Sequence, residues 1–553
     1  MITDKDTYLD EEVEEVVPFE RPAIRFSHIE SDDTGLRPYQ AEMKHNVYGL
    51  WDNIDNVMLQ MPTGTGKTIV FTSVVKDILR WCNLNSKDSK ILIVAHRREL
   101  IRQASRKLGD IPHGLIVSGE KLEMGKPVQV ASIQTFMSRR NYEQMRRERF
   151  DFIIIDEAHH CMAPGYQKLW DMFPNSKKLG VTATPWRMSH CGFTSLFGDI
   201  VLAKSIEWFV NQGYLANYDY ISIKPNSEVQ HAINGIERMG ADGDYLDSEL
   251  SAVMDKAKIR AGLYKSYAKY AKGKKGIIYA IDRNHANHIC ELYATKGVSI
   301  CMIDGTTPTS EREQKIAEFA NGEIEVIVNV NIFSEGFDCP DIEFIQLARP
   351  TKSLSLYLQQ VGRGLRISKG KGTTVILDNV GLYNRFGTPM ANRHWRYHFL
   401  GTDGNEGYND GSGIKRDLIL DSDTEYEPDY SEDDEEMVVV EHAEGNSQVR
   451  PDEANKAAGL SEYNVFRKNG LYGICNHNNR VIVPPIYEEM RPCHNGYIPF
   501  RQNGKWGILL TNGTVKVKPK YFNIGPFIND KAVVQNTADS EEYYINGKLE
   551  RIK

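Results

Sequence analysis

One segment of the sequence, MPTGTGKT at residues 61–68, has the residue types and spacing needed to bind phosphate. A strand-like apolar run at 57–59 precedes it, and a helix is predicted to start directly after it. Glycine lets backbone N–H groups curl around a phosphate, and a helix N-terminus adds partial positive charge. The loop residues predicted to cradle the phosphates are Gly64, Thr65 and Gly66.

Two side chains at the start of the predicted helix complete this site. Lys67 is placed to reach the β- and γ-phosphates of a nucleoside triphosphate, and the Thr68 hydroxyl is placed to ligate Mg²⁺. The usual loop pattern begins with glycine, whereas Met61 stands at that position here. We still expect the loop to bind nucleotide, because many ATP-driven motors relax that position.

An acidic pair follows a second apolar run. Residues 152–155, Phe-Ile-Ile-Ile, are typical of a strand buried on both faces, and Asp156 and Glu157 come directly after it. Ligands of open parallel sheets bind outside the carboxyl ends of the strands. Asp156 is therefore predicted to hold Mg²⁺ through its water shell, and Glu157 to orient and deprotonate an attacking water. An isolated Asp-Glu pair would more often cap a surface helix, but the upstream phosphate loop argues against that interpretation.

A basic string, QQVGRGLR, occupies residues 359–366. Gln359, Arg363 and Arg366 are spaced so that all three can share one helix face. Two guanidinium groups aimed at a γ-phosphate would stabilise the charge that develops during its transfer. On its own this would be an ordinary basic helix, but its position behind a second series of strands and helices favours a functional role.

These strings, in this order, resemble the motifs of superfamily 2 helicases over residues 36–378. The resemblance implies ATP and Mg²⁺ as cofactors. Arg37-Pro38-Tyr39-Gln40 matches the segment that reads adenine, which implies that Arg37 and Gln40 select ATP. Residues 334–338, Ser-Glu-Gly-Phe-Asp, match motif V, which implies nucleotide contacts from Gly336 and Asp338.

The resemblance also implies a path for nucleic acid and a link between hydrolysis and movement. Motifs Ia, Ic, IVa and V would supply contacts with the phosphate backbone from Arg97, Thr135, Thr306 and Ser334. Such contacts carry little sequence information. Thr182-Ala183-Thr184-Pro185 matches the coupling motif, and the residues expected to couple the ATP site to movement are His159, Thr182 and Thr184.

The sequences of the motifs favour one branch of this superfamily. SEGFDCP and QQVGRGLR look more like the DNA-translocating group, which includes type III restriction motor subunits and branched-DNA repair helicases, than like RNA helicases. We therefore expect an ATP-dependent DNA translocase or helicase, with DNA favoured over RNA as the partner. An RNA helicase, an ATP-controlled switch that licenses a partner protein, and a motor in a restriction-like or phage-defence assembly stay open.

The charge of the chain is unevenly distributed. The net charge is −8, yet residues 417–441 hold twelve acids and no Lys or Arg, and residues 1–17 hold seven acids and one Lys. Without these two segments the chain carries +10, which fits a body that grips phosphates. No run approaches 18 apolar residues, and the acidic start lacks a secretory signal, so no membrane partner and a cytoplasmic location are expected.

Cysteine spacing does not predict a metal or disulfide framework. The eight cysteines form no CxxC pair, which argues against a zinc finger. His159-His160-Cys161 and His190-Cys191 could be imagined as a metal cluster, but neither pair has flanking ligands at the usual spacing. We expect His159 to take part in coupling and the others to pack.

Alternating strand and helix signals predict an α/β fold with two tandem RecA-like doubly wound parallel-sheet domains, followed by an all-β repeat domain. Strands of the first sheet are expected at 57–59, 91–95, 128–133, 152–156 and 179–182, and those of the second at 276–280, 303, 325–330, 343–347 and 373–377. The predicted divisions are an acidic N-terminal extension (1–30), the first motor domain (31–215), a helical connector (216–273), the second motor domain (274–413), an acidic linker (414–458) and the repeat domain (459–553). The aromatic segment after 379 is expected to pack on the second domain. For the linker, a plain spacer is favoured over mimicry of DNA charge or partner docking.

An internal repeat begins at Phe466. Five residues of one copy recur 34 positions later in the next, namely Phe466, Gly470, Gly473, Pro485 and Tyr487 as Phe500, Gly504, Gly507, Pro519 and Tyr521. Asn-Gly between β-branched and aromatic runs predicts tight hairpins, and 546–547 suggests a frayed third copy. The units resemble WG repeats, with Lys505-Trp506-Gly507 as the signature. Trp506 is expected to be a core residue rather than a recognition aromatic, and the module is expected to target a protein or nucleic-acid partner.

Overall fold

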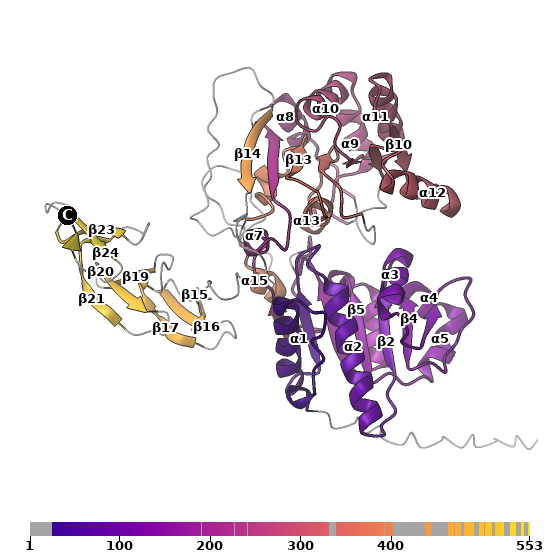
Figure 1. Ribbon diagram of the computed structural model, residues 1–553, viewed down its shortest axis with the longest axis horizontal. Helices are drawn as coiled ribbons and strands as arrows, with labels where there is room; N and C mark the ends of the chain where they lie inside the picture. Colours follow the sequence, from indigo (N-terminus) through magenta and orange to yellow (C-terminus); the bar gives the residue numbers. More distant parts are fainter. Residues whose placement is uncertain are drawn as a thin grey trace, which may run out of the picture. The chain divides into compact units, whose positions relative to one another are not determined.

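The computed structural model divides the chain into two compact units, residues 1–451 and 452–553 (Figure 1). In the first unit it describes residues 25–401, except 190, 226, 241, 331–338 and 392, together with 437–443. In the second it describes 463–468, 471–476, 481–490, 497–502, 504–510, 515–524, 531–537, 543–546 and 551–552. Within these residues no helix combines the length and apolar character needed to cross a bilayer.

The first sheet has seven parallel strands in the order β3-β4-β2-β5-β6-β1-β7. The strands are β1 (Asn56–Gln60), β2 (Ile91–Ala95), β3 (His113–Ile116), β4 (Val128–Ser132), β5 (Phe152–Asp156), β6 (Lys177–Thr182) and β7 (Asp199–Leu202). Five of them were predicted from their apolar runs. No strand was predicted at β3 or β7, the two edge strands, which are four residues long and carry weaker patterns.

Helices cover both faces of this sheet, which is why its central strands are apolar throughout. One face packs against α1 (Pro38–Trp51), α2 (Lys67–Leu84) and α3 (Arg98–Leu108). The other packs against α4 (Ile133–Phe136), α5 (Arg139–Arg146) and α6 (Pro164–Met172). The doubly wound arrangement predicted for the first domain is confirmed.

The second sheet has the strand order β10-β11-β9-β12-β13-β8-β14. Its strands are β8 (Tyr218–Ile223), β9 (Gly276–Tyr279), β10 (Ile300–Ile303), β11 (Val326–Asn329), β12 (Phe344–Leu347), β13 (Thr374–Asp378) and β14 (Met437–Ala443). Two helices, α10 (Ala257–Tyr270) and α11 (Arg283–Thr295), pack on one face, and α13 (Leu354–Gly364) packs on the other. The other α-helices among the described residues of this unit are α7 (Ile206–Asn211), α8 (Glu228–Asn234), α9 (Asp247–Met254), α12 (Thr309–Ala320), α14 (Tyr383–Phe386) and α15 (Trp395–Leu400).

The last two strands of this sheet come from segments in which no strand was predicted. β8 lies in the stretch expected to be a helical connector, and it pairs in parallel with β13. β14 lies in the stretch expected to be a solvated linker, and it pairs antiparallel with β8. Within β14, Val440 is 2 % exposed and Ala443 is 3 % exposed, so the strand contributes to the core. The apolar run at 437–440 is the local signal for it, at the end of the acidic tract.

The aromatic segment after β13 packs differently from the prediction. Its first part does lie on the second domain, because Phe386 stacks on Tyr357 of α13. α15, in contrast, joins the core of the first domain, where Phe399 stacks with Phe193 and accepts a hydrogen bond from the Phe193 N–H at 2.8 Å. Arg396 adds an ion pair with Asp199 of β7. The chain therefore crosses back to the first motor domain after completing β13.

The described residues of the C-terminal unit form three antiparallel sheets, as expected of a β-repeat domain. They are formed by β15 (Tyr463–Lys468) to β17 (Val481–Tyr487), by β18 (Glu489–Met490) to β21 (Val515–Tyr521), and by β22 (Asn523–Ile524) to β25 (Arg551–Ile552). The register repeats with the sequence, because Tyr472 pairs with Tyr487 in the first copy as Trp506 pairs with Tyr521 in the second. Trp506 is 3 % exposed, which confirms its expected place in the core.

Candidate functional site

The phosphate-type loop has the conformation that its glycines permit. Gly64 and Gly66 have φ angles of +87° and +91°, which side chains rarely adopt. Gly66 is the N-cap of α2, and its carbonyl accepts hydrogen bonds from the N–H groups of Ile69 and Val70 at 3.0 and 3.2 Å. The first N–H groups of α2 have no acceptor within the helix and point out of its N-terminus. The loop is therefore shaped to receive an anion.

Residues of the adenine-type segment hold this loop from one side. The Tyr39 hydroxyl and Gln40 Nε2 both donate to the Thr65 carbonyl, at 2.8 and 2.9 Å. A Cβ added to Gly66 would lie 2.3 Å from Gln40 Nε2, so glycine is needed for this close approach. The Arg37 guanidinium lies over the Tyr214 ring, 5.1 Å from its centroid. Gln40 thus adjoins the loop directly, and Arg37 lies beside it in the same segment, where its guanidinium also donates to the Tyr39 hydroxyl at 3.4 Å.

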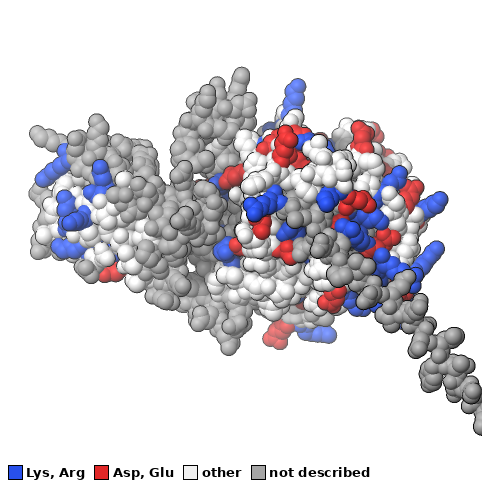
Figure 2. Space-filling view, turned by 90° about the horizontal axis from the view of Figure 1, so that it is seen from below, with Lys and Arg blue, Asp and Glu red and all other residues white. Residues whose placement is uncertain are grey.

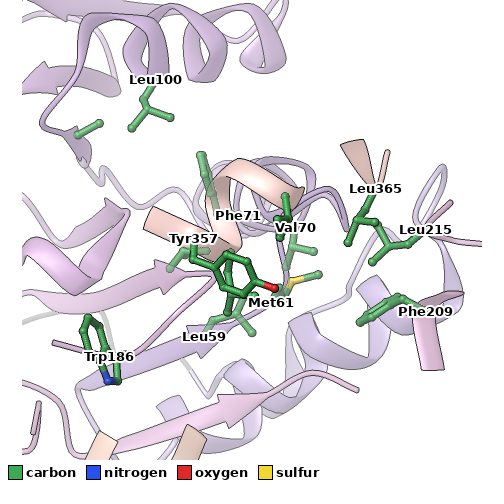
Figure 3. Close-up of a cluster of buried hydrophobic side chains, with 14 of the residues drawn as sticks. Leu59, Met61, Val70, Phe71, Leu100, Trp186, Phe209, Leu215, Tyr357 and Leu365 are labelled. Atoms are coloured by element: carbon green, nitrogen blue, oxygen red, sulfur yellow. The ribbon is translucent and has the colours of Figure 1, made fainter. Parts of the chain in front are cut away.

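Met61 occupies the position where the loop pattern usually has glycine. Its side chain is fully buried, and its N–H donates to the Thr182 carbonyl at 3.0 Å. Figure 3 shows the cluster of buried side chains that receives it, which includes Leu59, Val70, Tyr357 and Leu365. The methionine is tolerated because its side chain fills the core beneath the loop and leaves the phosphate side to the glycines.

The acidic pair lies at the carboxyl end of β5, as predicted. Asp156 is 4 % exposed and Glu157 is 7 % exposed, and Asp156 Oδ1 accepts a hydrogen bond from the Glu157 N–H at 3.0 Å. Glu157 has a φ of +51°, which turns the chain sharply after the strand. Its Oε2 lies 3.4 Å from His159 Nδ1. Strained backbone of this kind is characteristic of functional positions.

A series of side-chain contacts leads from Glu157 to the second domain. His159 Nδ1 lies 3.0 Å from the Thr182 hydroxyl, which accepts a hydrogen bond from the Thr184 N–H at 3.2 Å. The Thr184 hydroxyl donates to the Ser355 hydroxyl at 2.8 Å. Ser355 lies in the first turn of α13. The three predicted coupling residues are therefore joined to one another and to the helix that carries the basic string.

The C-terminal end of α13 packs directly on the phosphate-type loop. A Cβ added to Gly362 would lie 2.6 Å from Thr63 Cβ, and one added to Gly64 would lie 3.3 Å from Arg366 Cγ. Arg363 is 5 % exposed and Gln359 is 3 % exposed. The predicted helix through Arg366 is wrong in its end point, because α13 stops at Gly364. Arg366 nevertheless adjoins the loop.

Lys371 holds the chain just after α13. Its Nζ donates to the Arg366 carbonyl at 2.7 Å and also to the Gly364 carbonyl. Burial lowers the pKa of Lys371 to about 8. Lys371 and Ser355 were not among the predicted site residues, because an isolated lysine or serine carries no signal until the fold brings it to the site.

The residues present suit ATP and Mg²⁺. The loop has no side chain at the two glycine positions where a Cβ would crowd Gln40 or Arg366, so backbone groups can approach a phosphate closely. Thr68 and Asp156 offer the hard oxygen atoms that Mg²⁺ prefers. Cys161, in contrast, is fully buried in the core, and burial raises its pKa to about 12, as expected of a packing residue.

Three of the predicted nucleic-acid contacts lie in described segments. Arg97 is the N-cap of α3, and Thr135 lies in α4. Thr306 is exposed, and its hydroxyl donates to Asp304 at 3.0 Å. Burial acts to raise the pKa of Asp304, but hydrogen bonds from Thr307 and Thr306 hold it below its usual value. The predicted site residues Ser334, Gly336 and Asp338 lie outside the described residues.

Two ion pairs bring the first turns of α3 and α12 together across the two domains. Arg312 Nη1 lies 3.2 Å from Glu99 Oε1, and Arg102 Nη1 lies 3.4 Å from Glu313 Oε1. Arg97 precedes α3 directly, and Thr306 lies shortly before α12. Arg97 of the first domain and Thr306 of the second domain therefore both lie near the boundary between the two domains.

Two parallel-sheet domains whose contact region holds a phosphate-type loop, an acidic pair and a basic helix form a site suited to a nucleoside triphosphate. Residues 33–187 match the family model described as type III restriction enzyme, res subunit, and residues 257–368 match the helicase conserved C-terminal domain. Residues 472–506 and 511–537 match the WG containing repeat.

Two relatives and one solved structure are also similar to this chain. The "51.5 kDa protein" of Lactococcus phage (isolate 7-9) is 33 % identical over 62 % of this chain and 70 % of its own length. A Saccharomyces cerevisiae protein named as an ATP-dependent helicase, IRC3, is 31 % identical over 63 % of this chain and about half, 51 %, of its own length. A fragment described as an HsdR subunit of a type I restriction enzyme from Vibrio vulnificus YJ016 has the same fold, with a TM-score of 0.50, 19 % identity, and coverage of 66 % of this chain and 68 % of that one. The chain belongs to the superfamily 2 helicases, a family of ATP-hydrolysing enzymes, and carries WG repeats.

Proposed function

We propose that this chain is an ATP-dependent DNA translocase or helicase, in which ATP hydrolysis moves the protein along DNA or remodels it. The observation that carries the proposal is the contact series from Glu157 through His159 and the two threonines to Ser355. It connects the residue expected to act on water with a helix of the other domain. A change at the nucleotide therefore has a physical route to the contact between the domains.

Each residue of the ATP site has a role in this proposal. Lys67, Thr68 and Asp156 bind and orient the nucleotide with its metal ion, which supplies charge neutralisation at the phosphates. Glu157 orients the attacking water and accepts its proton. Arg363 and Arg366 stabilise the charge that develops on the transferred phosphoryl group.

DNA contacts are assigned to Arg97, Thr135, Thr306 and Ser334, with the WG repeats as a targeting module. The match to the family model of the type III restriction enzyme res subunit supports DNA as the track. The ion pairs that join the first turns of α3 and α12 support a shared path across both domains. Because backbone contacts read no sequence, target choice would come from the repeats or from a partner.

ATP hydrolysis by the purified chain tests the proposal. It is measured without nucleic acid and with single-stranded DNA, duplex DNA, forked DNA and RNA, with Glu157→Gln as the blank. We expect strong stimulation by DNA over RNA. Stimulation by RNA alone would identify an RNA helicase, and no stimulation by any of them would favour a partner-controlled switch.

Displacement of a block separates movement from switching. The substrate carries a triplex or a streptavidin block beyond a loading tract, and its release is followed with ATP. A translocase releases the block at a rate that depends on ATP. Hydrolysis stimulated by DNA without release would contradict translocation.

A further inference from the structure

Strand β21 of the second WG repeat carries a row of lysines on one face. It lies at one end of its sheet. Val517 and Tyr521 point into the hydrophobic core of the unit, whereas the alternating residues Lys516, Lys518 and Lys520 are exposed. Two residues of a regular strand span about 6.7 Å, and the register of β21 with β20 shifts within this stretch. On the face of this unit seen in Figure 2, most of the described charged side chains are basic.

An exposed aromatic ring and a fourth lysine adjoin the row. Phe522 follows β21 directly and is 47 % exposed. Its N–H donates to the Gln535 carbonyl at 2.8 Å, so its backbone is held in place. Trp506 of β20 (Lys505–Leu510) pairs with Tyr521, and the exposed Lys505 and Phe522 are the residues directly before and after this pair.

The first repeat shows that the fold does not require these residues. The core positions agree between the two copies, since Val483 and Tyr487 correspond to Val517 and Tyr521 at a spacing of 34. The surface positions do not agree. Where the second copy has Lys505, Lys516, Lys518, Lys520 and Phe522, the first has Leu471, Ile482, Pro484, Ile486 and Glu488. Ile486 is 45 % exposed, so the position is a surface position in both copies.

We propose that the lysine row of β21, with Lys505 and Phe522, is a binding surface for single-stranded nucleic acid in the WG repeat unit. Lysines in a line match the repeating negative charge of a phosphate backbone. An exposed aromatic ring beside such a row provides a face on which a base can stack. This inference adds to the proposed function by naming what the repeat module binds. It rests on the proposed function for the choice of DNA over RNA.

Protection of a sheet edge is the competing explanation for the row, because lysines on edge strands prevent pairing between molecules. Edge protection needs charge of either sign, whereas a phosphate surface needs positive charge. The two explanations therefore predict different results when the positive charges of the row are replaced by negative ones. Changing Lys516, Lys518 and Lys520 together to glutamate should leave the oligomeric state of the chain unchanged but remove the nucleic-acid contact.

Binding of a fluorescent oligonucleotide to the full-length chain tests the surface at several salt concentrations. Lys516→Gln/Lys518→Gln/Lys520→Gln should weaken binding of single-stranded DNA about tenfold and reduce the slope of log affinity against log salt by about 2, from about 0.7 per lost phosphate contact. Phe522→Ala should weaken single-strand binding about fivefold or more and leave duplex binding nearly unchanged. Binding of RNA of the same sequence, measured in the same way, shows whether the surface prefers a DNA or an RNA backbone.

The control removes the same charge from elsewhere, as Lys265→Gln/Lys272→Gln/Lys296→Gln, three exposed lysines of the second motor domain. The proposal would be overturned if the β21 variants had the same affinity for DNA, and the same slope of log affinity against log salt, as this control. Equal competition by polyglutamate of the same charge would also overturn it, because the surface would then respond to an acidic peptide. Reversal to glutamate with no loss of DNA binding would leave edge protection as the explanation.

Failure of this inference can be told apart from failure of the proposed motor function. The β21 variants keep the ATP site, so hydrolysis at saturating DNA should stay as in the unaltered chain while the DNA concentration for half stimulation rises. Unchanged half stimulation and unchanged binding would reject the surface and leave the motor standing. A chain that binds single strands through the row, but whose hydrolysis no nucleic acid stimulates, would reject the motor and keep the surface.

Discussion

Glu157 combines a buried carboxylate with a left-handed backbone. The left-handed region costs a non-glycine residue roughly 1–2 kcal/mol. Its φ of +51° is one of two positive values at non-glycine positions among the described residues. The conformation directs the chain from the end of β5 so that Glu157 Oε2 lies near His159. We interpret the strained turn as the feature that separates the roles of Asp156 and Glu157, which are adjacent in sequence.

Three substitutions at the ATP site should have different signatures. Lys67→Ala should weaken nucleotide binding, because it removes the point charge at the phosphates. Glu157→Gln should retain binding and stop turnover, because the amide cannot accept a proton. Arg366→Ala should reduce turnover about 10³-fold if the guanidinium stabilises the developing charge. Binding of a fluorescent ATP analogue and steady-state hydrolysis measure these effects.

The exposed Lys369, three residues after Arg366, provides the matched control. Lys369→Ala removes a positive charge at nearly the same place in the chain and should hydrolyse ATP normally. Hydrolysis near the unaltered rate by Glu157→Gln or by Arg366→Ala would contradict the role given to that residue.

At the scale of elements, α13 joins the two domains at both of its ends. Its first turn accepts the hydrogen bond from Thr184 through Ser355, and its last turn packs on the phosphate-type loop through Gly362. Between these points, the Tyr357 hydroxyl donates to the Tyr220 hydroxyl at 3.2 Å in the core of the second domain. A helix held at three places moves as one body, so displacement at the loop is passed to the second sheet.

The hydrogen bond between Thr184 and Ser355 can be tested as a pair. Thr184→Val and Ser355→Ala should each retain nucleotide binding but lose much of the stimulation by DNA, because both break the same contact. The double variant should lose no more of the stimulation by DNA than either single variant. The coupling free energy between the two substitutions, taken from the double-mutant cycle, should be about 1 kcal/mol. Stimulated hydrolysis and block displacement are the measurements. Thr295→Val, on an exposed part of α11, is the control. If the losses of the two single variants add up in the double variant, Thr184 and Ser355 do not act together.

At the scale of the whole molecule, β14 belongs to the motor unit. The strand extends the second sheet beyond β8, and the Tyr218 hydroxyl donates to the Glu441 carboxylate. Burial raises the pKa of Glu441 above its usual value, with hydrogen bonds from Tyr218 and Thr388 opposing the shift. The acidic tract therefore ends in a structural strand before the chain reaches the repeat unit.

A pair of truncations should separate the strand from the repeats. A chain that ends at Gly445 keeps β14 and should retain stimulated ATP hydrolysis and its melting temperature while losing targeting. A chain that ends at Glu436 lacks β14 and should melt about 5 °C lower or more, because buried Val440 and the Glu441 contact are lost. Calorimetry and hydrolysis measure both. Equal melting temperatures would contradict a structural role of β14, and unchanged localisation and substrate choice in the longer form would contradict targeting by the repeats.

Most residues of the proposed ATP site lie in short strings that point to it from the sequence alone. The loop glycines, Lys67 and the Asp156–Glu157 pair act through backbone conformation and charge within a few residues, so their signals are local. The apolar runs of the central strands are equally local, since a strand covered on both faces must be apolar throughout. The repeat at a spacing of 34 residues was also visible without any structure, and with it the core position of Trp506.

Tertiary structure alone decided which distant segments meet. β14 pairs with β8 more than two hundred residues earlier, and α15 returns to the first domain, although neither contact is marked in the local pattern. The partner of Thr184 is a serine with no distinguishing neighbours, and the exposed face of β21 is defined by what its other face packs against. Local sequence determines the conformation and chemistry of a segment, whereas the partner of a segment depends on packing among parts of the chain that the sequence keeps far apart.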